Sequence, residues 1–406
     1  MFEDMGLQYS GPVDGHNIKR IVEALEWANR QSEPVVIHVL TQKGKGYDYA
    51  ERSPEEYHGV CPFDYRVGVT DVKERTFSSV FGDELAKLAA HDPRICAITA
   101  SMETGTGLNG FASMFPERYF DVGIAEGHAA AMAAGLASRG AIPVFAVYST
   151  FLQRSYDMLI HDIAISGLHV VLAVDRAGLV PGDGETHQGL FDVAYLTSIP
   201  GMTVFCPGSF AEMCDMLRYA VDSVDGPVAV RYPRGSEGAY KDGGAEAVKH
   251  VRLGNDFTIV TYGYSINTAI EAADLLEHDG IFVEIIKLGC ISPISTDVIA
   301  ASVEKTERLL VLEECAGRGC VGENIAAALA QGKRVYGCPA KHSKDDRSTH
   351  RSASSEDCSN IKIPKNVILL NTGNCFAPCG EIDELRKFCG IDTQSIYEAV
   401  KTGIAV

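Results

Sequence analysis

The sequence predicts an α/β protein built around parallel sheets, and three observations carry that prediction. Short, strongly apolar segments recur along the chain. Amphipathic or Ala-rich segments of helical length separate them. The apolar segments are hydrophobic throughout instead of alternating, which is typical of strands buried on both faces. Such strands in alternation with helices predict a parallel sheet covered by helices on each side.

The first 70 residues contain a predicted helix and a predicted strand. An amphipathic stretch at 18–29 is followed by PVVIHVL at 34–40, and a Gly- and Tyr-rich loop then runs to about residue 65. We interpret residues 1–70 as the last part of an α/β domain.

Two further sets of alternating elements follow, at 71–240 and 241–406. In the first set, helices at 77–90, 129–136, 151–165 and 209–222 alternate with the strands ICAITA, IPVFAVY, HVVLAVD and PVAVRY. In the second, helices at 266–277, 295–305 and 322–331 alternate with FTIVTYG, FVEIIKL, RLLVLEE and VILLN. We interpret these sets as two α/β domains, the second one smaller. The polar, Ser-rich stretch 332–366 predicts a solvated surface loop within it.

Composition narrows the class of protein. A chain of 406 residues with 46% hydrophobic and 22% charged residues has ample core for about two to three domains. The net charge of -18 argues against nucleic acid or an anionic membrane as a partner. No apolar run reaches membrane-spanning length and the start, MFEDMGLQYS, lacks the features of a signal peptide, so we expect a cytoplasmic protein. The 12 cysteines are scattered without a CxxC pair, which favours buried thiols over a zinc site.

The segment DVGIAEGHAAAMAAGLASRG, residues 121–140, places Glu126 near the start of an apolar helix. A carboxylate there complements the helix dipole, which gives it a purely structural interpretation. The chemistry of the residues that follow favours a functional one.

Three polar segments each follow an apolar strand: YSTFLQRSYD at 148–157, DRAGLVPGDGETHQG at 175–189 and RYPRG at 231–235. The carboxyl ends of parallel strands meet at one edge of a sheet, where α/β proteins bind ligands. We therefore expect one cleft to contain Arg154, Arg176, Arg231, Tyr148, Asp183 and His187. Arginine beside tyrosine suits a phosphate group, and His187 suits either proton transfer or a structural role.

The segment GTGLNG at 105–110 matches the dinucleotide-binding pattern G-x-G-x-x-G. The predicted strand ICAITA ends several residues before Gly105, whereas a dinucleotide site needs its first glycine at the turn from strand to helix. We interpret the segment as a flexible glycine loop, an interpretation that leaves open a place beside an active site.

The order of motifs GPVDGH, QKGKGY, YFDVGIAEGH, YSTFLQRSYD, HDIAI, DRAGLVPGDGETHQG and RYPRG resembles that of the 1-deoxy-D-xylulose-5-phosphate synthase family. The resemblance covers the chain outside 332–366. It implies a transketolase-like enzyme with a pyrimidine-binding domain, a transketolase C-terminal-like domain and a remnant of a diphosphate-binding domain. It also implies the cofactor thiamine diphosphate, the substrates pyruvate and glyceraldehyde 3-phosphate, and a homodimer or a complex with a separate N-terminal chain.

The resemblance also implies roles for individual residues. Glu126 corresponds to the glutamate that bonds the aminopyrimidine ring and activates the cofactor, Phe151 to a residue stacked on that ring, and Tyr47 to a cofactor contact. A further set corresponds to groups that bind or act on the acceptor: Tyr148, Arg176 and Arg231 on its phosphate, Asp183 and His187 near its hydroxyl and carbonyl groups, and His58 as an active-site histidine.

The chain departs from the family in several places. Family members begin about 200 residues earlier, the length of a whole domain. That part holds a GDG motif and an Asn that bind diphosphate and Mg²⁺, so we expect no metal ligands in this chain. Gly127 replaces a usual Gln, and Cys379 stands where a His is common.

Three functions follow from these observations. The chain is part of an active synthase, or a noncatalytic fragment or partner, or half of another thiamine diphosphate enzyme such as a pyruvate dehydrogenase β-like subunit. YPRG, THQG and GPVDGH favour the synthase over the last of these.

Overall fold

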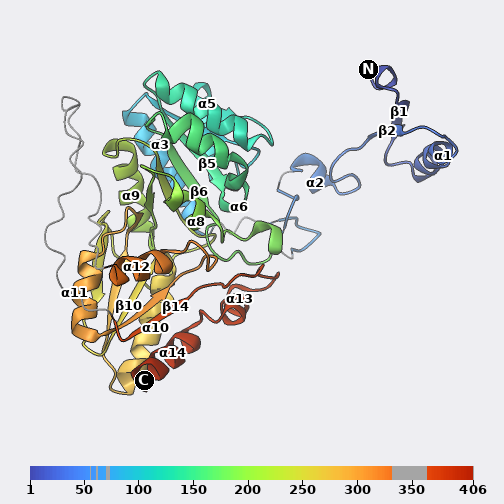
Figure 1. The fold of residues 1–406 in the computed structure, drawn as a ribbon. Helices are drawn as coiled ribbons and strands as arrows, with labels where there is room; N and C mark the ends of the chain where they lie inside the picture. Colours follow the sequence, from blue (N-terminus) through green and yellow to red (C-terminus); the bar gives the residue numbers. More distant parts are fainter. Residues whose placement is uncertain (55, 61–62, 70–73, 332–363, 406) are drawn as a thin grey trace. The chain divides into compact units, whose positions relative to one another are not determined.

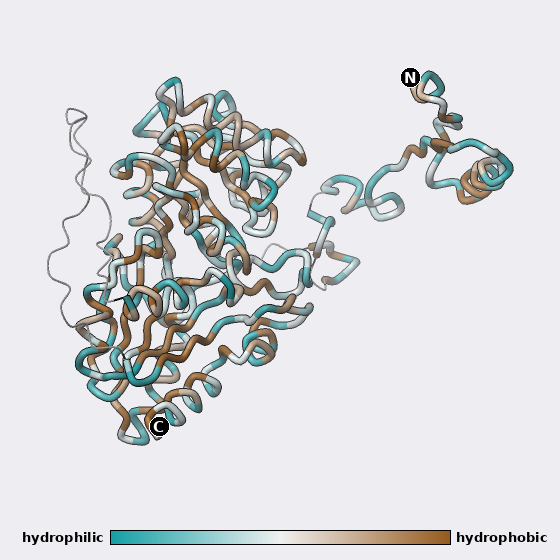
Figure 2. Tube along the Cα trace, in the orientation of Figure 1, coloured by the Kyte–Doolittle hydropathy of each residue, from teal (hydrophilic) through white to brown (hydrophobic). Residues whose placement is uncertain are grey.

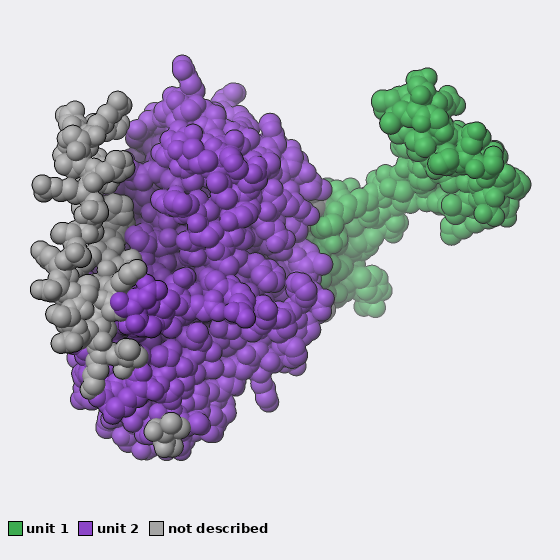
Figure 3. All heavy atoms as spheres, in the orientation of Figure 1, with its two compact units in different colours: residues 1–74 green, residues 75–406 purple. Residues whose placement is uncertain are grey.

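The computed structural model describes residues 1–54, 56–60, 63–69, 74–331 and 364–405. The chain divides into two compact units, Met1–Glu74 and Arg75–Val406 (Figure 3). Most of the loop predicted at 332–366 lies outside the described residues. Across the part that is described, every helix is too short or too polar to cross a lipid bilayer.

The first unit is a small parallel βαβ arrangement. It contains the 3-10 helix η1 (Glu3–Met5), β1 (Gln8–Asp14), α1 (Ile18–Ala28), β2 (Val35–Leu40) and α2 (Asp48–Arg52). The side chain of Asn17 caps α1 by accepting a hydrogen bond from the Arg20 amide at 3.2 Å. Strand β1 was not predicted, because Gly11 and Pro12 interrupt its apolar pattern.

A seven-stranded sheet forms the first half of the second unit (Figure 1). Its order is β12-β7-β8-β6-β5-β3-β4. The strands are β3 (Ile95–Thr99), β4 (Tyr119–Asp121), β5 (Ile142–Tyr148), β6 (Val171–Asp175), β7 (Thr203–Phe205), β8 (Val228–Arg231) and β12 (Cys290–Ser292). All neighbours are parallel except β12 and β7. The predicted parallel α/β architecture is therefore confirmed.

Helices cover both faces of this sheet. One face carries α3 (Phe77–His91), α4 (Asn109–Met114) and α9 (Phe210–Asp222), and the other carries α5 (Glu126–Ser138) and α8 (Asp192–Ser198). Within each strand alternate residues enter the two clusters: Val144 faces α3 and α9, whereas Phe145 faces α5. Apolar residues accordingly concentrate along the strands in the hydropathy view (Figure 2).

The helix predicted at 151–165 differs in detail from the observed segment. The chain turns helical directly after β5 and changes hydrogen-bonding pattern along its length, through α6 (Ser149–Leu152), η3 (Gln153–Ser155), α7 (Tyr156–Met158) and the π-helical η4 (Leu159–Ala164). In η4 the amide of Ile165 donates to the carbonyl of Ile160 at 3.0 Å, which is a π-type bond. A uniform α-helical pattern is therefore wrong for this segment.

A five-stranded sheet forms the second half of the same unit. Its order is β14-β13-β10-β11-β9, with β9 (Val248–Arg252), β10 (Phe257–Tyr262), β11 (Val283–Leu288), β13 (Arg308–Leu312) and β14 (Asn366–Leu370). Helices α10 (Ser265–His278), α13 (Ile382–Cys389) and α14 (Thr393–Ala405) pack in one cluster, and α11 (Asp297–Thr306) and α12 (Val321–Ala330) in the other. Strand β9 is antiparallel and lies at the edge, and its polar sequence VKHVR gave no strand signal.

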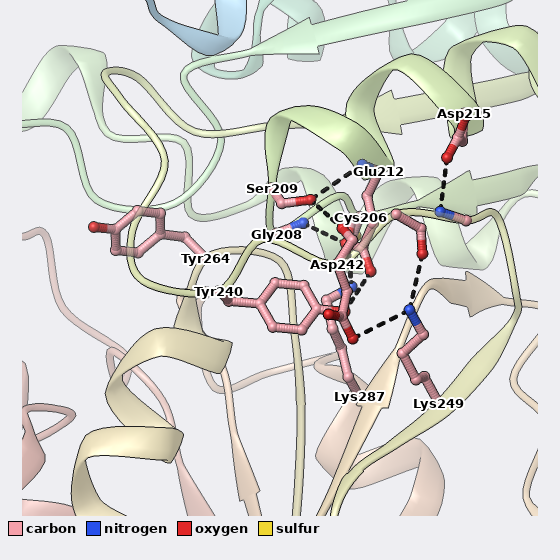
Figure 4. Close-up of polar contacts among 12 residues, drawn as sticks. Cys206, Gly208, Ser209, Glu212, Asp215, Tyr240, Asp242, Lys249, Tyr264 and Lys287 are labelled. Carbon is pink, nitrogen blue, oxygen red and sulfur yellow. Dashed lines mark hydrogen bonds and ion pairs between the residues drawn. The ribbon is translucent and has the colours of Figure 1, made fainter.

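A buried ion pair joins the two halves of this unit (Figure 4). Lys287 on β11 lies 2.8 Å from the Glu212 carboxylate on α9, and both side chains are almost completely buried. Glu212 also accepts hydrogen bonds from the Tyr240 hydroxyl at 2.7 Å and the Gly208 amide at 2.8 Å. Lys287 donates to the Cys206 carbonyl at 3.3 Å. Each charge thus has several partners, as a buried pair requires.

Candidate functional site

A row of stacked side chains extends from the end of β5. Tyr148 and Phe151 are stacked with ring centroids 5.9 Å apart. The Arg154 guanidinium lies 5.0 Å from the Phe151 centroid, and His187 meets the same ring edge-on at 5.5 Å. The segment YSTFLQR therefore brings one phenol, one phenyl and one guanidinium together with the histidine of the following loop.

Glu126 lies at the first position of α5 and is 4% exposed. Its Oε1 accepts a hydrogen bond from Arg154 Nη1 at 2.7 Å. Its Oε2 accepts none from the residues that the structure describes. The Arg154 guanidinium thus fixes one oxygen of this carboxylate at the N-terminus of α5, and the other oxygen is left for a further donor.

Arg176 adopts a left-handed backbone conformation, with φ of 56°, at the end of β6. Its guanidinium lies 3.7 Å from the Tyr148 ring centroid and donates to the Gly105 carbonyl at 2.8 Å and to Asp175 at 3.1 Å. Burial raises the pKa of Asp175, although Arg176 and Ser78 oppose that shift. Burial also raises the pKa of Tyr148. The glycine loop at 105–110 therefore does reach the predicted site residues.

Asp183 and His187 lie on the loop that follows Arg176. Asp183 forms an ion pair with Arg234, which also donates to the Pro181 carbonyl at 3.0 Å. The Thr186 hydroxyl lies 2.9 Å from His187 Nδ1. Arg234 was not predicted as a site residue. Its position in the motif RYPRG, three residues after Arg231, is the sequence signal that indicates it.

The structure gives Arg231 an environment that differs from the predicted shared cleft. It is 5% exposed, and it donates to Asp192 Oδ2 at 2.8 Å and to the carbonyls of Gly189 and Glu314 at 3.2 and 3.0 Å. Burial lowers its pKa, but Asp192, Tyr262 and Cys206 together outweigh that effect and the pKa is raised overall. Arg231 therefore bonds to protein groups on three sides, whereas Arg154 and Arg176 flank the aromatic row.

Tyr47 and His58 belong to the first unit and are described there alone. The Tyr47 hydroxyl donates to the Tyr65 carbonyl at 2.8 Å, and its ring contacts Tyr49, Tyr57 and Phe63. His58 Nδ1 lies 2.8 Å from Lys43 Nζ. Tyr47 is thus half-buried in an aromatic cluster, whereas His58 is exposed.

Gly127 and Cys379, the two positions that differ from the usual residues of the resembled family, lie beside predicted site residues. A Cβ at Gly127 would lie 2.7 Å from Met158 Cε, the end of a flexible side chain. Cys379 Sγ donates to the Gly182 carbonyl at 3.3 Å, so this thiol touches the loop that carries Asp183.

A separate pocket of about 570 Å³ lies between α10, α13 and α14 and includes none of the predicted site residues. Among the described residues, no group of three or more His, Cys, Asp or Glu side chains is placed to hold a metal ion.

Comparison with known families divides the chain into three matched regions. Residues 73–238 match the transketolase pyrimidine binding domain, and 246–343 match the transketolase C-terminal domain. Residues 1–41 match the family described as 1-deoxy-D-xylulose-5-phosphate synthase.

Curated relatives carry the same name. The chain is 38% identical to 1-deoxy-D-xylulose-5-phosphate synthase of Clostridium tetani, over 98% of this chain and 61% of the relative. It is 39% identical to that of Caldanaerobacter subterraneus, over 98% and 60% respectively. With the synthase of Clostridium kluyveri, identity is 46% over 80% of this chain and 53% of the relative. The chain thus spans between about half and three-fifths of the curated relatives' length.

One solved structure matches this chain over almost its whole length. It is named "Split gene transketolase, inactive beta4 tetramer" and matches with a TM-score of 0.66 and 25% identity, over 81% of this chain and 98% of that one.

Proposed function

Because the chain belongs to the 1-deoxy-D-xylulose-5-phosphate synthase family, we propose that it provides the pyrimidine-binding and C-terminal domains of such a synthase. The assembled enzyme condenses pyruvate with glyceraldehyde 3-phosphate and releases CO₂. Its product is a precursor for isoprenoids, thiamine and pyridoxal. The observation that carries the proposal is the pairing of buried Glu126 with the aromatic row, on a domain matched over 73–238.

The residues around Glu126 fit the pyrimidine half of thiamine diphosphate. A ring nitrogen of an aminopyrimidine accepts a hydrogen bond, and it donates one when it carries a proton, so a carboxyl group that can share a proton suits it. Its flat face suits an apolar ring to stack against. Glu126 supplies a buried carboxylate with Oε2 unused by the described residues, and Phe151 supplies the ring. When bound, the cofactor supplies the carbanion chemistry that decarboxylation of pyruvate requires. The part of Glu126 is to share a proton between its Oε2 and a nitrogen of the pyrimidine ring, while Arg154 holds its other oxygen.

Tyr148 and Arg176 are the proposed ligands of the acceptor phosphate. The guanidinium, held over the phenol by Asp175 and the Gly105 carbonyl, offers donors in a fixed geometry. Asp183 and His187 lie on the same loop, where they suit contacts with the acceptor's hydroxyl and carbonyl groups. For Arg231, predicted as a third phosphate ligand, burial favours a supporting role through its bond to Gly189.

We propose that residues outside this chain hold the diphosphate and Mg²⁺, and that Tyr47 and His58 join them in the assembled site. The expected assembly is a cytoplasmic homodimer or a complex with a separate N-terminal chain. The isolated chain then has little or no synthase activity. The match to a chain of a split-gene transketolase, over 98% of that chain, supports this arrangement.

A noncatalytic partner is the second candidate. The similar solved structure favours it, because that split transketolase chain is described as an inactive tetramer. A pyruvate dehydrogenase β-like subunit is disfavoured, because the curated relatives cited above are named synthases.

The test is an assay of the purified chain with thiamine diphosphate, Mg²⁺, pyruvate and glyceraldehyde 3-phosphate. It is run with and without a second chain that carries the diphosphate-binding domain of a family member. We expect turnover only in the mixture. Full turnover from the 406-residue chain alone would refute the need for a second chain, and no turnover in either sample would favour the noncatalytic partner.

The variant Glu126→Gln tests the proposed role of the Glu126 carboxylate in the same assay. The amide keeps the shape but loses the charge, so turnover should fall by at least about a hundredfold, as expected for loss of a general acid–base group. Glu117→Gln, on the exposed η2 turn (Pro116–Arg118), is the matched control. Unchanged turnover in Glu126→Gln would exclude the proposed role.

A further inference from the structure

The loop 176–189 carries three of the proposed acceptor-binding residues, yet it has little regular structure of its own. The single 3-10 turn η5 (Glu185–His187) is the only helical element that the structure describes in it. Its two ends meet in a short antiparallel bridge, where Gly178 and Gly189 exchange backbone hydrogen bonds of 2.8 and 2.9 Å. We call this bridged end of the loop its neck. Two hydrogen bonds between the Gln188 side chain and the Val180 backbone, of 2.8 and 3.0 Å, reinforce it from within the loop, and contacts from outside add to them.

Glu314, two residues after β13, packs directly on the neck. Its Oε2 accepts a hydrogen bond from the Leu179 amide at 3.4 Å. A Cβ at Gly178 would lie 2.7 Å from the same oxygen, so only glycine permits this approach. The backbone carbonyl of Glu314 accepts a bond from Arg231, which also bonds Gly189 on the other side of the neck.

Glu314 is also tied to the segment that holds the tip of the loop. Its Oε1 accepts a hydrogen bond from Arg386 Nε on α13 at 2.9 Å. The residues just before α13 bond to the part of the loop beyond the neck, which we call its tip. The Gly182 amide donates to the Gly380 carbonyl at 3.2 Å, and the Gln188 side chain donates to the Pro378 carbonyl at 3.3 Å. One carboxylate therefore bonds the neck directly and the tip through α13.

Burial strengthens both contacts. Glu314 is 7% exposed, and the Arg386 side chain is 13% exposed and stacked 4.8 Å from the Tyr264 ring centroid. Burial lowers the pKa of Arg386, but Glu314, with smaller contributions from Tyr264 and Asp383, outweighs that effect and the pKa is raised. In a dry environment a carboxylate with two donors is costly to replace by a group with one acceptor.

We infer that Glu314 is a positioning residue for the acceptor site, acting through the loop 176–189. The inference rests on the proposed function only for what the loop binds, and the contacts that carry it lie within the second unit. A glutamine at this position has one acceptor oxygen, so it can serve Arg386 or the Leu179 amide but not both.

The first experiment measures hydrogen–deuterium exchange on the purified full chain, and it needs no enzymatic activity. In Glu314→Gln, amides at 177–190 should exchange roughly tenfold faster, the effect of losing one charge-assisted hydrogen bond. Strands β3 and β5 should keep their protection. Glu323→Gln is the control, because Glu323 caps the Gly319 amide in the same half of the unit and has no described contact with the loop.

Arg386→Gln tests the route through α13. It should speed exchange at the tip near Gly182 more than at the neck near Gly178. It also replaces Glu314→Gln as the test variant if Glu314→Gln fails to fold. Unchanged loop exchange in a folded Glu314→Gln, or in Arg386→Gln where the first variant does not fold, overturns the inference.

The second experiment uses the assembled enzyme. Glu314→Gln should raise KM for glyceraldehyde 3-phosphate about tenfold while leaving the affinity for thiamine diphosphate unchanged. A loosened loop with unchanged KM would overturn the link to the acceptor. Faster exchange in an assembly that never turns over would leave the loop contact standing and contradict only the proposed function.

Discussion

Arg154 and Glu126 form a 2.7 Å ion pair at the start of α5, although 28 residues separate them in sequence. The same guanidinium lies over Phe151. One side chain thus touches both residues proposed to contact the pyrimidine ring. The three arginines expected to share a cleft divide into separate tasks: Arg154 holds Glu126, Arg176 covers Tyr148, and Arg231 supports the loop.

Arg154→Met should therefore weaken the site more than the fold. The Arg154 side chain is 54% exposed, so solvent screens the pair and the loss in unfolding free energy should be only about 1 kcal/mol. Cofactor affinity in the assembled enzyme should fall clearly. Chemical denaturation and fluorescence titration with thiamine diphosphate measure the two effects. Arg154→Lys should restore part of the affinity, and equal losses in both variants would argue against a role for charge.

Gly105→Ala should displace Tyr148. A Cβ at this position would lie 1.6 Å from the Tyr148 hydroxyl oxygen, which no adjustment of a methyl group avoids. We expect KM for the acceptor to rise about tenfold or more, with a thermal midpoint a few degrees lower. Gly110→Ala is the control, because nothing lies within 4 Å of its added Cβ. A wild-type KM in Gly105→Ala would show that Tyr148 does not contact the acceptor.

Lys287→Met should strongly destabilise the second unit. It leaves Glu212 buried without its cation, and breaking such a pair typically costs about 3–5 kcal/mol. Removing both charges with Lys287→Met and Glu212→Gln should recover part of that loss. Urea denaturation of the single and double variants measures the coupling. A double variant as unstable as the sum of the two singles would mean that the charges do not interact.

Stability should decrease at alkaline pH because of buried thiols. Burial raises the pKa of Cys96 from 9.0 to about 11, and those of Cys206 and Cys320 to about 12. Above pH 9 the unfolded chain loses thiol protons that the folded chain retains, so unfolding becomes more favourable until the folded thiols also ionise. Thermal midpoints measured from about pH 8 to 11 should fall. Cys206→Ser or Cys206→Ala should reduce the slope, and a slope that stays the same would place its origin elsewhere.

The sequence predicted most of the strongly apolar strands and the helices between them, because burial on both faces leaves a clear pattern. It missed β9, whose edge position allows polar residues, and β1, which contains Gly11 and Pro12. It also missed β7 and β12, which are three residues long each. These strands depend on their neighbours more than on their own residues.

The sequence indicated individual residues of the candidate site, but it did not indicate their hydrogen-bond and ion-pair partners. The position of Arg231 at a strand end suggested an exposed ligand, but nothing in its local sequence indicated Asp192 or the Glu314 carbonyl. Arg234 contacts Asp183, and nothing in its local sequence indicates that partner. Long-range pairings of this kind follow from tertiary packing, which a single sequence without structure does not specify.

Strand β12 has a consequence for how this protein can be divided. Residues 290–292 come from the C-terminal half in sequence, yet they pair with β7 at the edge of the seven-stranded sheet. A pyrimidine-binding module cut at residue 240 would lose that strand and expose the backbone groups of β7 to other chains. The two halves of the second unit therefore cannot be exchanged independently between related proteins. A chimera that combines halves from different relatives must match the 290–292 segment to the sheet that it completes, or the recombined protein will tend to aggregate.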